Sequence, residues 1–252
     1  MNISIALAVY NEEKNLSRCL SSIVDIADEI IVVDGGSTDG TVSIAKKFNA
    51  KIIKTDNPKI FHINKQKALD ACSGIWILQL DADEVITQEL KKEIITVIQS
   101  DSMHNGFFIS RRNYFWGYFM KKGGQYPDAV IRLVRRGTAE FPCKSVHEQI
   151  TVEGNVGTLT HPMEHYSYQT RSSYWKKADI YTSLTAIEIQ KDNMNVLMKF
   201  LKFCIVKPTV TFFSIYIRHK GFIDRFTGLE FSLYSALHFP WAYYKSLGIK
   251  DA

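Results

Sequence analysis

The feature that most constrains the fold is the alternation of apolar runs with helical spacing along the first third of the chain. Short runs rich in Ile, Val and Leu predict strands, and apolar residues three or four positions apart predict the helices between them. The strands are expected at residues 3–9, 29–33, 50–55 and 75–80. Successive strand–helix units imply a mostly parallel sheet with helices on both faces, so the expected fold class is α/β.

Polar side chains gather where three of these strands end. The clusters are Tyr10-Asn11-Glu12, Asp34-Gly35-Gly36 and Asp81-Ala82-Asp83. Open α/β sheets bind their ligands beyond the carboxyl ends of the strands. We therefore expect one binding site at this edge, built from segments that lie far apart in the sequence.

The rest of the chain follows other patterns. Residues 106–160 contain short aromatic strands and glycine turns, which predict an antiparallel extension of the sheet. Residues 172–191 predict a helix capped by Thr170 or Ser172. Residues 196–247 combine aromatic and basic residues with several helix breakers, so short amphipathic helices are expected there. The breakers are Pro208, Gly221, Gly228 and Pro240.

Composition narrows the class of protein. The chain has 252 residues, 46% hydrophobic and 23% charged, so we expect a globular protein. The net charge of +5 suits anionic partners, but the basic residues are dispersed and no recognition motif is visible, so nucleic acid is not expected as a partner. Four separated cysteines indicate a reducing compartment. The amino terminus is typical of a first strand and not of a signal peptide, and no apolar run reaches the roughly 18 residues that span a bilayer. A cytoplasmic protein without a spanning helix is expected.

Asp81 and Asp83 are the strongest chemical signal. Two carboxylates at this spacing after a buried strand can provide oxygen ligands for a divalent ion that bridges a diphosphate. An acidic turn that precedes a helix near Thr87 is the alternative. The glycine-rich turn after Asp34 is equally compatible with an ordinary strand-to-helix connection. It matches neither the P-loop nor the dinucleotide-binding pattern, which leaves ATPase and dehydrogenase functions without their usual support.

Taken together, these segments resemble the family-2 glycosyltransferases of GT-A fold, whose nucleotide-diphospho-sugar transferase domain has a Rossmann-like mixed sheet. The pattern is similar to that of the branch containing lipopolysaccharide-core glucosyltransferases. The resemblance is carried by residues 8–13 and 32–41, Asn64-Lys65, Leu80-Asp81-Ala82-Asp83-Glu84 and, more loosely, Tyr126-Pro127-Asp128, Val146-His147-Glu148 and His165-Tyr166-Ser167-Tyr168. A tail element at residues 222–228 is also similar, but Arg225 stands where the family more often has glycine.

The resemblance implies a role for each matching position at the donor site. The residues expected to bind the nucleotide are Tyr10, Glu12, Asp34, Lys65 and Asp81. Mg²⁺ or Mn²⁺ would be held by Asp83, Asp81 and His165, and would offset charge on the leaving nucleoside diphosphate. His161 is close enough in sequence to compete with His165 as the ligand.

The acceptor side follows from the same resemblance. Glu148 would be the general base that removes the acceptor hydroxyl proton in an inverting displacement, with His147 beside it. A surface strand glutamate is the alternative reading of Glu148. Asp128 and Arg132 would lie near the acceptor or the diphosphate, unless Arg132 and its neighbours at 135 and 136 form a solvated strand face.

The expected organisation is a GT-A domain over residues 1–190 and an amphipathic helical tail over residues 191–252. Aromatic and basic side chains in the tail suit a membrane interface with anionic lipids, with a helical cap or a dimer contact as alternatives. The implied activity is transfer of a sugar from a nucleotide-diphosphate donor, with UDP as the expected nucleotide, to a glycan or lipid-linked acceptor. This activity would serve lipopolysaccharide or cell-surface glycan synthesis at the inner face of the membrane, where the protein would be peripheral. A non-catalytic nucleotide-sugar or membrane-surface binding module is the alternative function.

Overall fold

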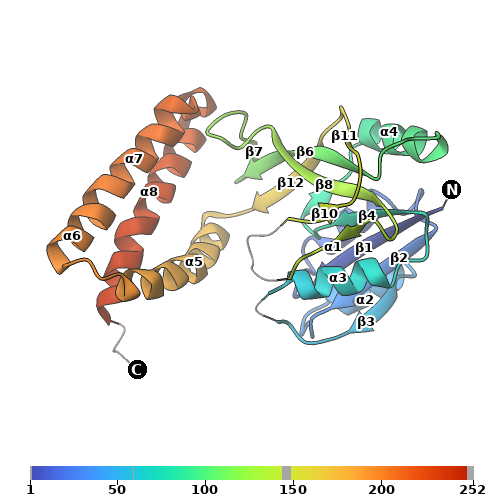
Figure 1. The fold of residues 1–252 in the computed structure, drawn as a ribbon, viewed down its shortest axis with the longest axis horizontal. Coiled ribbons are helices and arrows are strands. Elements are labelled where there is room, and N and C mark those ends of the chain that lie inside the picture. The colour runs from blue at the N-terminus through green and yellow to red at the C-terminus, as the bar shows by residue number, and fades with distance from the viewer. Residues whose placement is uncertain (1, 59, 144–148, 249–252) are drawn as a thin grey trace. The chain divides into compact units, whose positions relative to one another are not determined.

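The computed structural model describes residues 2–58, 60–143 and 149–248, and the chain forms two compact units (Figure 1). The first unit consists of Met1–Arg111 and Ala129–His165, and the second of Arg112–Asp128 and Tyr166–Ala252. The boundary expected near residue 190 falls inside the second unit, because the helix that begins at Arg171 packs on the last helix of the chain.

Parallel strands form the centre of the first unit. β1 (Ile3–Val9) lies between β2 (Glu29–Asp34) and β4 (Trp76–Leu80), and β3 (Lys51–Lys54) lies outside β2. All three pairings are parallel. The connecting helices are α1 (Leu16–Ser21), α2 (Thr41–Lys47) and α3 (His62–Asp70). The α/β prediction is confirmed, and the strands and helices follow one another in the predicted order.

Alternate side chains of the central strands enter two separate cores. Ile5 and Leu7 of β1 pack in the core that includes Leu20 of α1. Ala6 of the same strand packs in the opposite core, which includes Ala68 of α3. Because successive side chains of a strand point to opposite faces, β1 is buried on both sides, as a strand between two helical layers must be. The helices therefore cover both faces, as predicted.

The later strands extend the sheet beyond β4. β8 pairs with β4 in the antiparallel direction, with Val134 opposite Ile77. The predicted antiparallel extension is thus present in β8, although β11 runs parallel to β6, with Val156 opposite Gly106. The remaining elements are β5 (Glu84–Val85), α4 (Gln88–Gln99), β6 (Gly106–Phe115), β7 (Tyr118–Phe119), β8 (Asp128–Arg135), β9 (Ala139–Glu140), β10 (Thr151–Val152), β11 (Val156–Thr158) and β12 (Met163–Tyr168).

Helices dominate the second unit. α5 (Arg171–Lys191) begins at Thr170, whose hydroxyl accepts from the N–H of Ser173, so Thr170 is the cap and Ser172 is not. The chain then forms the helical segments α6 (Val196–Phe200), η1 (Leu201–Val206), α7 (Lys207–Phe213), η2 (Ser214–Arg218), η3 (Gly221–Asp224) and α8 (Arg225–Gly248).

The prediction of short helices in this region is wrong. Val196–Arg218 is one continuous helix, and α8 continues through both Gly228 and Pro240. Pro208 is the second residue of α7, which follows the π-helical segment η1 directly, and a wide turn of this kind can accommodate a residue without a backbone N–H. The prediction that no segment is long and apolar enough to span a membrane is also wrong, because Val196–Arg218 meets that test by length and composition alone.

Candidate active site

Two loops at the carboxyl ends of β1 and β2 are tied together by hydrogen bonds. The N–H of Asn11 donates to Oγ of Ser37 at 2.9 Å, and Oδ1 of Asn11 accepts from the N–H of Thr38 at 2.9 Å. One residue further on, the N–H of Glu12 donates to the hydroxyl of Thr41 at 2.7 Å. Tyr10 precedes this junction and leaves 45% of its surface exposed. Tyr10 and Glu12, which are predicted to bind the nucleotide, therefore belong to a loop that is fixed by hydrogen bonds to the loop after β2.

Asp34 organises the second of these loops. Its side chain is buried, and its carboxylate accepts from the N–H groups of Gly36 and Ser37 at 3.2 to 3.3 Å. Gly36 has a φ of +84°, a backbone conformation that glycine adopts without steric cost. Asp34 therefore stabilises an ordinary turn through its hydrogen bonds. It also lies at the carboxyl end of β2, where a ligand of such a sheet would bind.

Asp81 is bound by two cations at the carboxyl end of β4. Lys65 Nζ lies 2.5 Å from Oδ1, and Arg132 Nη2 donates to Oδ2 at 2.6 Å. Burial alone would raise the pKa of Asp81, but the charges of Arg132 and Lys65 outweigh it and hold that pKa well below its usual range. Asp81 is therefore ionised, and its negative charge is already neutralised by the protein.

Arg132 is buried, which contradicts the solvated-face interpretation. Its Nη1 donates to Oε1 of Gln79 at 2.5 Å, and its Nη2 donates to Oε1 of Glu84 at 2.7 Å. Arg135, at the end of the same strand, is half-buried and donates to the carbonyls of Ser102 and His104. Arg136, just beyond the strand, donates to the carbonyl of Gly74 but is exposed. Among the described residues, the Nε group of Arg132 is a buried donor without a hydrogen-bond partner. A ligand oxygen could satisfy it.

Glu84 is a member of this cluster that the sequence analysis did not assign. It is completely buried, Oε2 accepts from the N–H of Asp81 at 3.0 Å, and its own N–H donates to the carbonyl of Asp81 at 3.0 Å. Arg111 Nη1 lies 3.6 Å from its Oε1. The available signal was a third carboxylate directly after Asp83. Glu84 closes the turn between β4 and β5 and fixes Arg132 beside Asp81.

Asp83 and His165 lie together where β12 meets this turn. His165 Nε2 is 3.5 Å from Oδ2 of Asp83, because β12 pairs with β5 so that His165 stands opposite Glu84. His161 lies elsewhere, with its Nδ1 at 2.8 Å from Glu93. Of the two histidines considered from the sequence, the geometry thus favours His165 as the partner of Asp83.

These residues partly fit a divalent metal ion. Within the described ranges, no group of three His, Cys, Asp or Glu side chains is placed to hold a metal, but Asp83 and His165 provide one oxygen and one nitrogen donor. Asp81 is occupied by its two cations. The carboxylates of Asp81, Asp83 and Glu84 balance the cations Lys65, Arg111 and Arg132, so an incoming diphosphate would add charge that a metal ion could offset.

A cavity of about 280 Å³ opens beside the cluster. Lys65, Asp81 and Arg132 line it together with Arg111. The aromatic part of its wall comes from Phe61, His62 and Phe141, and the His62 ring stacks on Phe141 with their centroids 5.1 Å apart. Cations beside aromatic and apolar walls are typical of sites that bind charged, ring-containing ligands.

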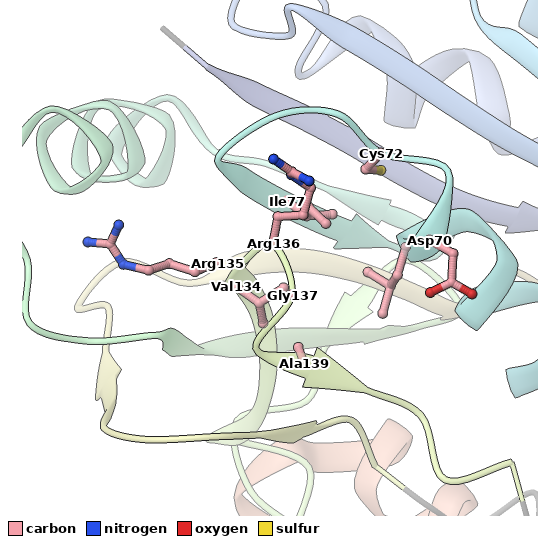
Figure 2. A pocket seen from close by; sticks show the side chains of 9 residues that line it. Asp70, Cys72, Ile77, Val134, Arg135, Arg136, Gly137 and Ala139 are labelled. Carbon is pink, nitrogen blue, oxygen red and sulfur yellow. The ribbon is translucent and has the colours of Figure 1, made fainter.

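A second cavity of about 240 Å³ lies near the amino-terminal end of β4 (Figure 2). Ile77, Val134 and Cys72 line it, and the guanidinium of Arg135 points away from Asp70. Arg135 instead lies over the ring of Trp76, 4.4 Å from its centroid. This cavity is remote from the strand ends that carry Asp34 and Asp81, so we do not assign the reaction to it.

Of the remaining predicted residues, two lie outside the described ranges and one belongs to the second unit. Glu148 and His147, the predicted base and its neighbour, lie outside the described residues. Asp128 belongs to the second unit, where its Oδ2 accepts from Nδ2 of Asn113 at 2.9 Å.

Comparison with known proteins identifies the class to which this fold and site belong. Residues 4–145 match the model of glycosyl transferase family 2. The chain is 30% identical to the lipopolysaccharide core biosynthesis glycosyltransferase LpsC of Rhizobium meliloti (strain 1021), over 93% of this chain and 90% of LpsC. It is 28% identical to the uncharacterized glycosyltransferase RT0209 of Rickettsia typhi, over 88% of this chain and 81% of that protein.

A structural match agrees with the fold. The crystal structure of S. aureus TarS 1-349 in complex with UDP-GlcNAc aligns with a TM-score of 0.51 and 18% identity, over 96% of this chain and 81% of that one. The chain belongs to glycosyl transferase family 2. It is a glycosyltransferase of GT-A fold, which confirms the resemblance drawn from its motifs.

Proposed function

We propose that the protein transfers a sugar from a UDP-sugar to the lipopolysaccharide core, or to another lipid-linked glycan, at the inner face of the membrane. The observation that carries the proposal is the convergence of Lys65 and Arg132 on Asp81 at the carboxyl end of β4. The choice of acceptor is supported by the similarity to LpsC, which extends over nearly all of both chains.

Lys65 and Arg132 would bind the diphosphate of the donor. Both cations are less than one-tenth exposed, so their interaction with phosphate oxygens would be weakly screened by water. The buried Nε group of Arg132 is a further donor for such an oxygen. Asp81 and Glu84 would hold the guanidinium in place, and donors fixed before the reaction stabilise developing charge most effectively.

Asp83 and His165 would hold the divalent metal, Mg²⁺ or Mn²⁺. When bound, the ion supplies Lewis-acid stabilisation of the leaving UDP. Asp83 would contribute its carboxylate oxygen and His165 its Nε2, which faces Asp83. Asp34 would orient the loop against which the base and ribose lie, and Tyr10 and Glu12 would border the nucleotide.

Glu148 would act as the general base. The acceptor hydroxyl oxygen attacks the anomeric carbon, its proton passes to the Glu148 carboxylate, and the bond from that carbon to the UDP oxygen breaks with inversion. His147 would orient Glu148 or contact the acceptor. Arg132 would bind the diphosphate, and Asp128 would contact the acceptor.

Thermal unfolding with nucleotides tests the donor site. Ligands that bind the native state raise the unfolding temperature by mass action. We expect UDP to stabilise the wild type more than GDP, dTDP or CDP, and more with Mn²⁺ than without it. Asp83→Ala and His165→Ala should lose the metal-dependent part of the shift, whereas the matched control His161→Ala should keep it.

Turnover separates the enzyme from a binding module. Glu148→Gln should bind UDP as the wild type does but form no glycosylated acceptor from a UDP-sugar. A wild type that binds UDP and transfers no sugar to any lipid-linked glycan would contradict the proposed activity. The absence of a shift with every nucleotide and metal would contradict the donor site itself.

A further inference from the structure

Exposed apolar side chains follow one face of the helix Val196–Arg218. Val206, Val210, Phe213 and Ile217 are each more than half exposed, and they recur every three or four residues. Between Val196 and Arg218, all of which the structure describes, Phe203 is the one buried side chain. A core helix of a soluble protein would be covered along such a face.

α8 presents a second apolar stripe. Leu233, Leu237, Trp241 and Tyr244 are each 45% or more exposed and are also spaced three or four residues apart. α7 packs against α8, so the two helices are neighbours within the second unit (Figure 1). Helix Val196–Arg218 has 23 residues, and about 20 residues of helix are needed to cross the roughly 30 Å hydrocarbon layer of a bilayer.

The lysines that interrupt this segment in the sequence do not interrupt its exposed face. Lys199 donates to a backbone carbonyl at the end of α5, and Lys202 Nζ lies 3.4 Å from a carboxylate oxygen of Asp192. Lys207 Nζ lies over the ring of Phe239 in α8, 5.1 Å from its centroid. Their charges are therefore held by neighbouring segments of the second unit, and the apolar stripe is continuous.

The two helices and the turn between them carry a net positive charge. Residues 196–247 contain seven Lys and Arg against two acidic residues. Both acids are bound internally: Asp224 accepts from the backbone N–H groups of Lys121 and Lys122 at 2.9 and 2.8 Å, and Glu230 pairs with Arg171. The turn between the two helices carries exposed basic residues. They are Arg218, Lys220 and Arg225.

We propose that helix Val196–Arg218 and α8 insert their exposed apolar side chains into the hydrocarbon layer of an anionic lipid bilayer. The second unit is then an embedded anchor and not a peripheral surface contact. A bilayer accounts for both observations, because hydrocarbon covers the apolar stripes while anionic headgroups bind the basic turn. A second copy of the same face would cover the stripes but would bring no negative charge. For its biological use the inference rests on the proposed membrane location of the acceptor.

Vesicle flotation of the full chain tests the anchor. The protein is mixed with vesicles of phosphatidylcholine containing phosphatidylglycerol, floated, and washed with high salt and then with alkaline carbonate. We expect it to stay with the lipid through both washes. The variant Val210→Ser/Phe213→Ser/Ile217→Ser should partition into the vesicles at least about tenfold less, since each side chain loses its apolar burial.

Two further variants separate apolar insertion from electrostatic attraction to the membrane. Val24→Ser/Ile75→Ser/Met103→Ser changes three exposed apolar residues of the first unit and should float as the wild type does. Arg218→Gln/Lys220→Gln/Arg225→Gln should weaken capture by anionic vesicles but leave the bound fraction resistant to high salt.

Three results would overturn the inference. Release of the wild type by high salt would show a peripheral, electrostatic contact. Equal flotation of the Val210 triple variant and the wild type would place the contact elsewhere. A wild-type dimer that ignores vesicles, and that becomes a monomer in the Val210 triple variant, would show that a second copy covers the face. UDP-dependent thermal stabilisation, measured on the same samples without lipid, reports separately on the donor site and on folding.

Discussion

Replacing Glu84 by glutamine removes one charge from a fully buried cluster. Both oxygens of Glu84 are acceptors, Oε1 for Arg132 and Oε2 for the N–H of Asp81. Glutamine offers one acceptor and one NH₂ donor, so one of these two donors would face another donor. The Arg132 guanidinium would also keep one carboxylate fewer within hydrogen-bond distance.

The expected loss of stability follows from these contacts. Breaking a buried ion pair by removing one partner costs about 3–5 kcal/mol. We expect the lower end, about 3 kcal/mol, because Arg132 still donates to Asp81 at 2.6 Å. For a chain of this size each kcal/mol lowers the unfolding temperature by about 2–4 °C, so the expected decrease is about 6–12 °C.

Urea and thermal unfolding, followed by circular dichroism, measure this change. Glu89→Gln is the matched control, because Glu89 is exposed in the first turn of α4, and its loss should remain within about 0.5 kcal/mol. In a double-mutant cycle, Glu84→Gln/Arg132→Met should cost at least about 1 kcal/mol less than the sum of the single variants. A Glu84→Gln variant within about 1 kcal/mol of the wild type would refute the reasoning that Glu84 anchors Arg132.

Three further changes test other parts of the chain. Arg225 has a φ of +54° and a ψ of −135°, so Arg225→Gly should raise stability by about 1 kcal/mol in thermal unfolding, while Arg225→Ala should not. A Cβ on Gly228 would lie 1.9 Å from the carbonyl oxygen of Gly221, so Gly228→Ala should make the second unit sensitive to trypsin under conditions in which the wild type resists it. Burial alone would raise the pKa of Glu93, but hydrogen bonds from the backbone of Thr160 and from His161 outweigh it and lower that pKa. Its contribution is therefore complete above the ordinary glutamate pKa and is lost as the pH falls from that value through the lowered pKa of the folded state. Glu93→Gln should cost about 1–3 kcal/mol at neutral pH and progressively less below about pH 4, as measured by urea unfolding.

The parallel half of the fold is predictable from the sequence because its signals are local. β1, β2 and β4 are short, mostly apolar runs, and turns with helical patterns separate the successive strands from Ile3 to Leu80. The polar clusters at Asp34 and Asp81 could be assigned to one sheet edge from the topology of such sheets. The cap of the helix could be narrowed to Thr170 or Ser172, because capping involves residues only a few positions apart, and the hydrogen bond from Ser173 shows that it is Thr170.

The partners of Asp81 could not be predicted in this way. Arg132 is 51 residues further along the chain and reaches Asp81 because β8 pairs with β4 in the antiparallel direction. A segment that contains Arg132, Arg135 and Arg136 is equally compatible with a solvated face until that register is known. The role of Glu84 could not be predicted for the same reason, since its burial depends on the pairing of β12 with β5.

The apolar face of the helix Val196–Arg218 could not be predicted from the sequence for a different reason. Counting charges along the sequence treats Lys202 and Lys207 as interruptions of the apolar run. Where each lysine points depends on the neighbouring segments, which the sequence pattern alone does not place. The family preference for glycine at position 225 is by contrast explained by the backbone, which there adopts a positive φ.

The hydrogen bonds between the loops after β1 and β2 have a thermodynamic consequence. Asn11 and Glu12 are bound to residues 26 to 29 positions away, so these loops are ordered during folding and not by the ligand. A nucleotide that enters between ordered loops loses little affinity to conformational entropy. Calorimetric titration with UDP should therefore show a small heat-capacity change, set by the area of the nucleotide that is buried and not by refolding of the loops.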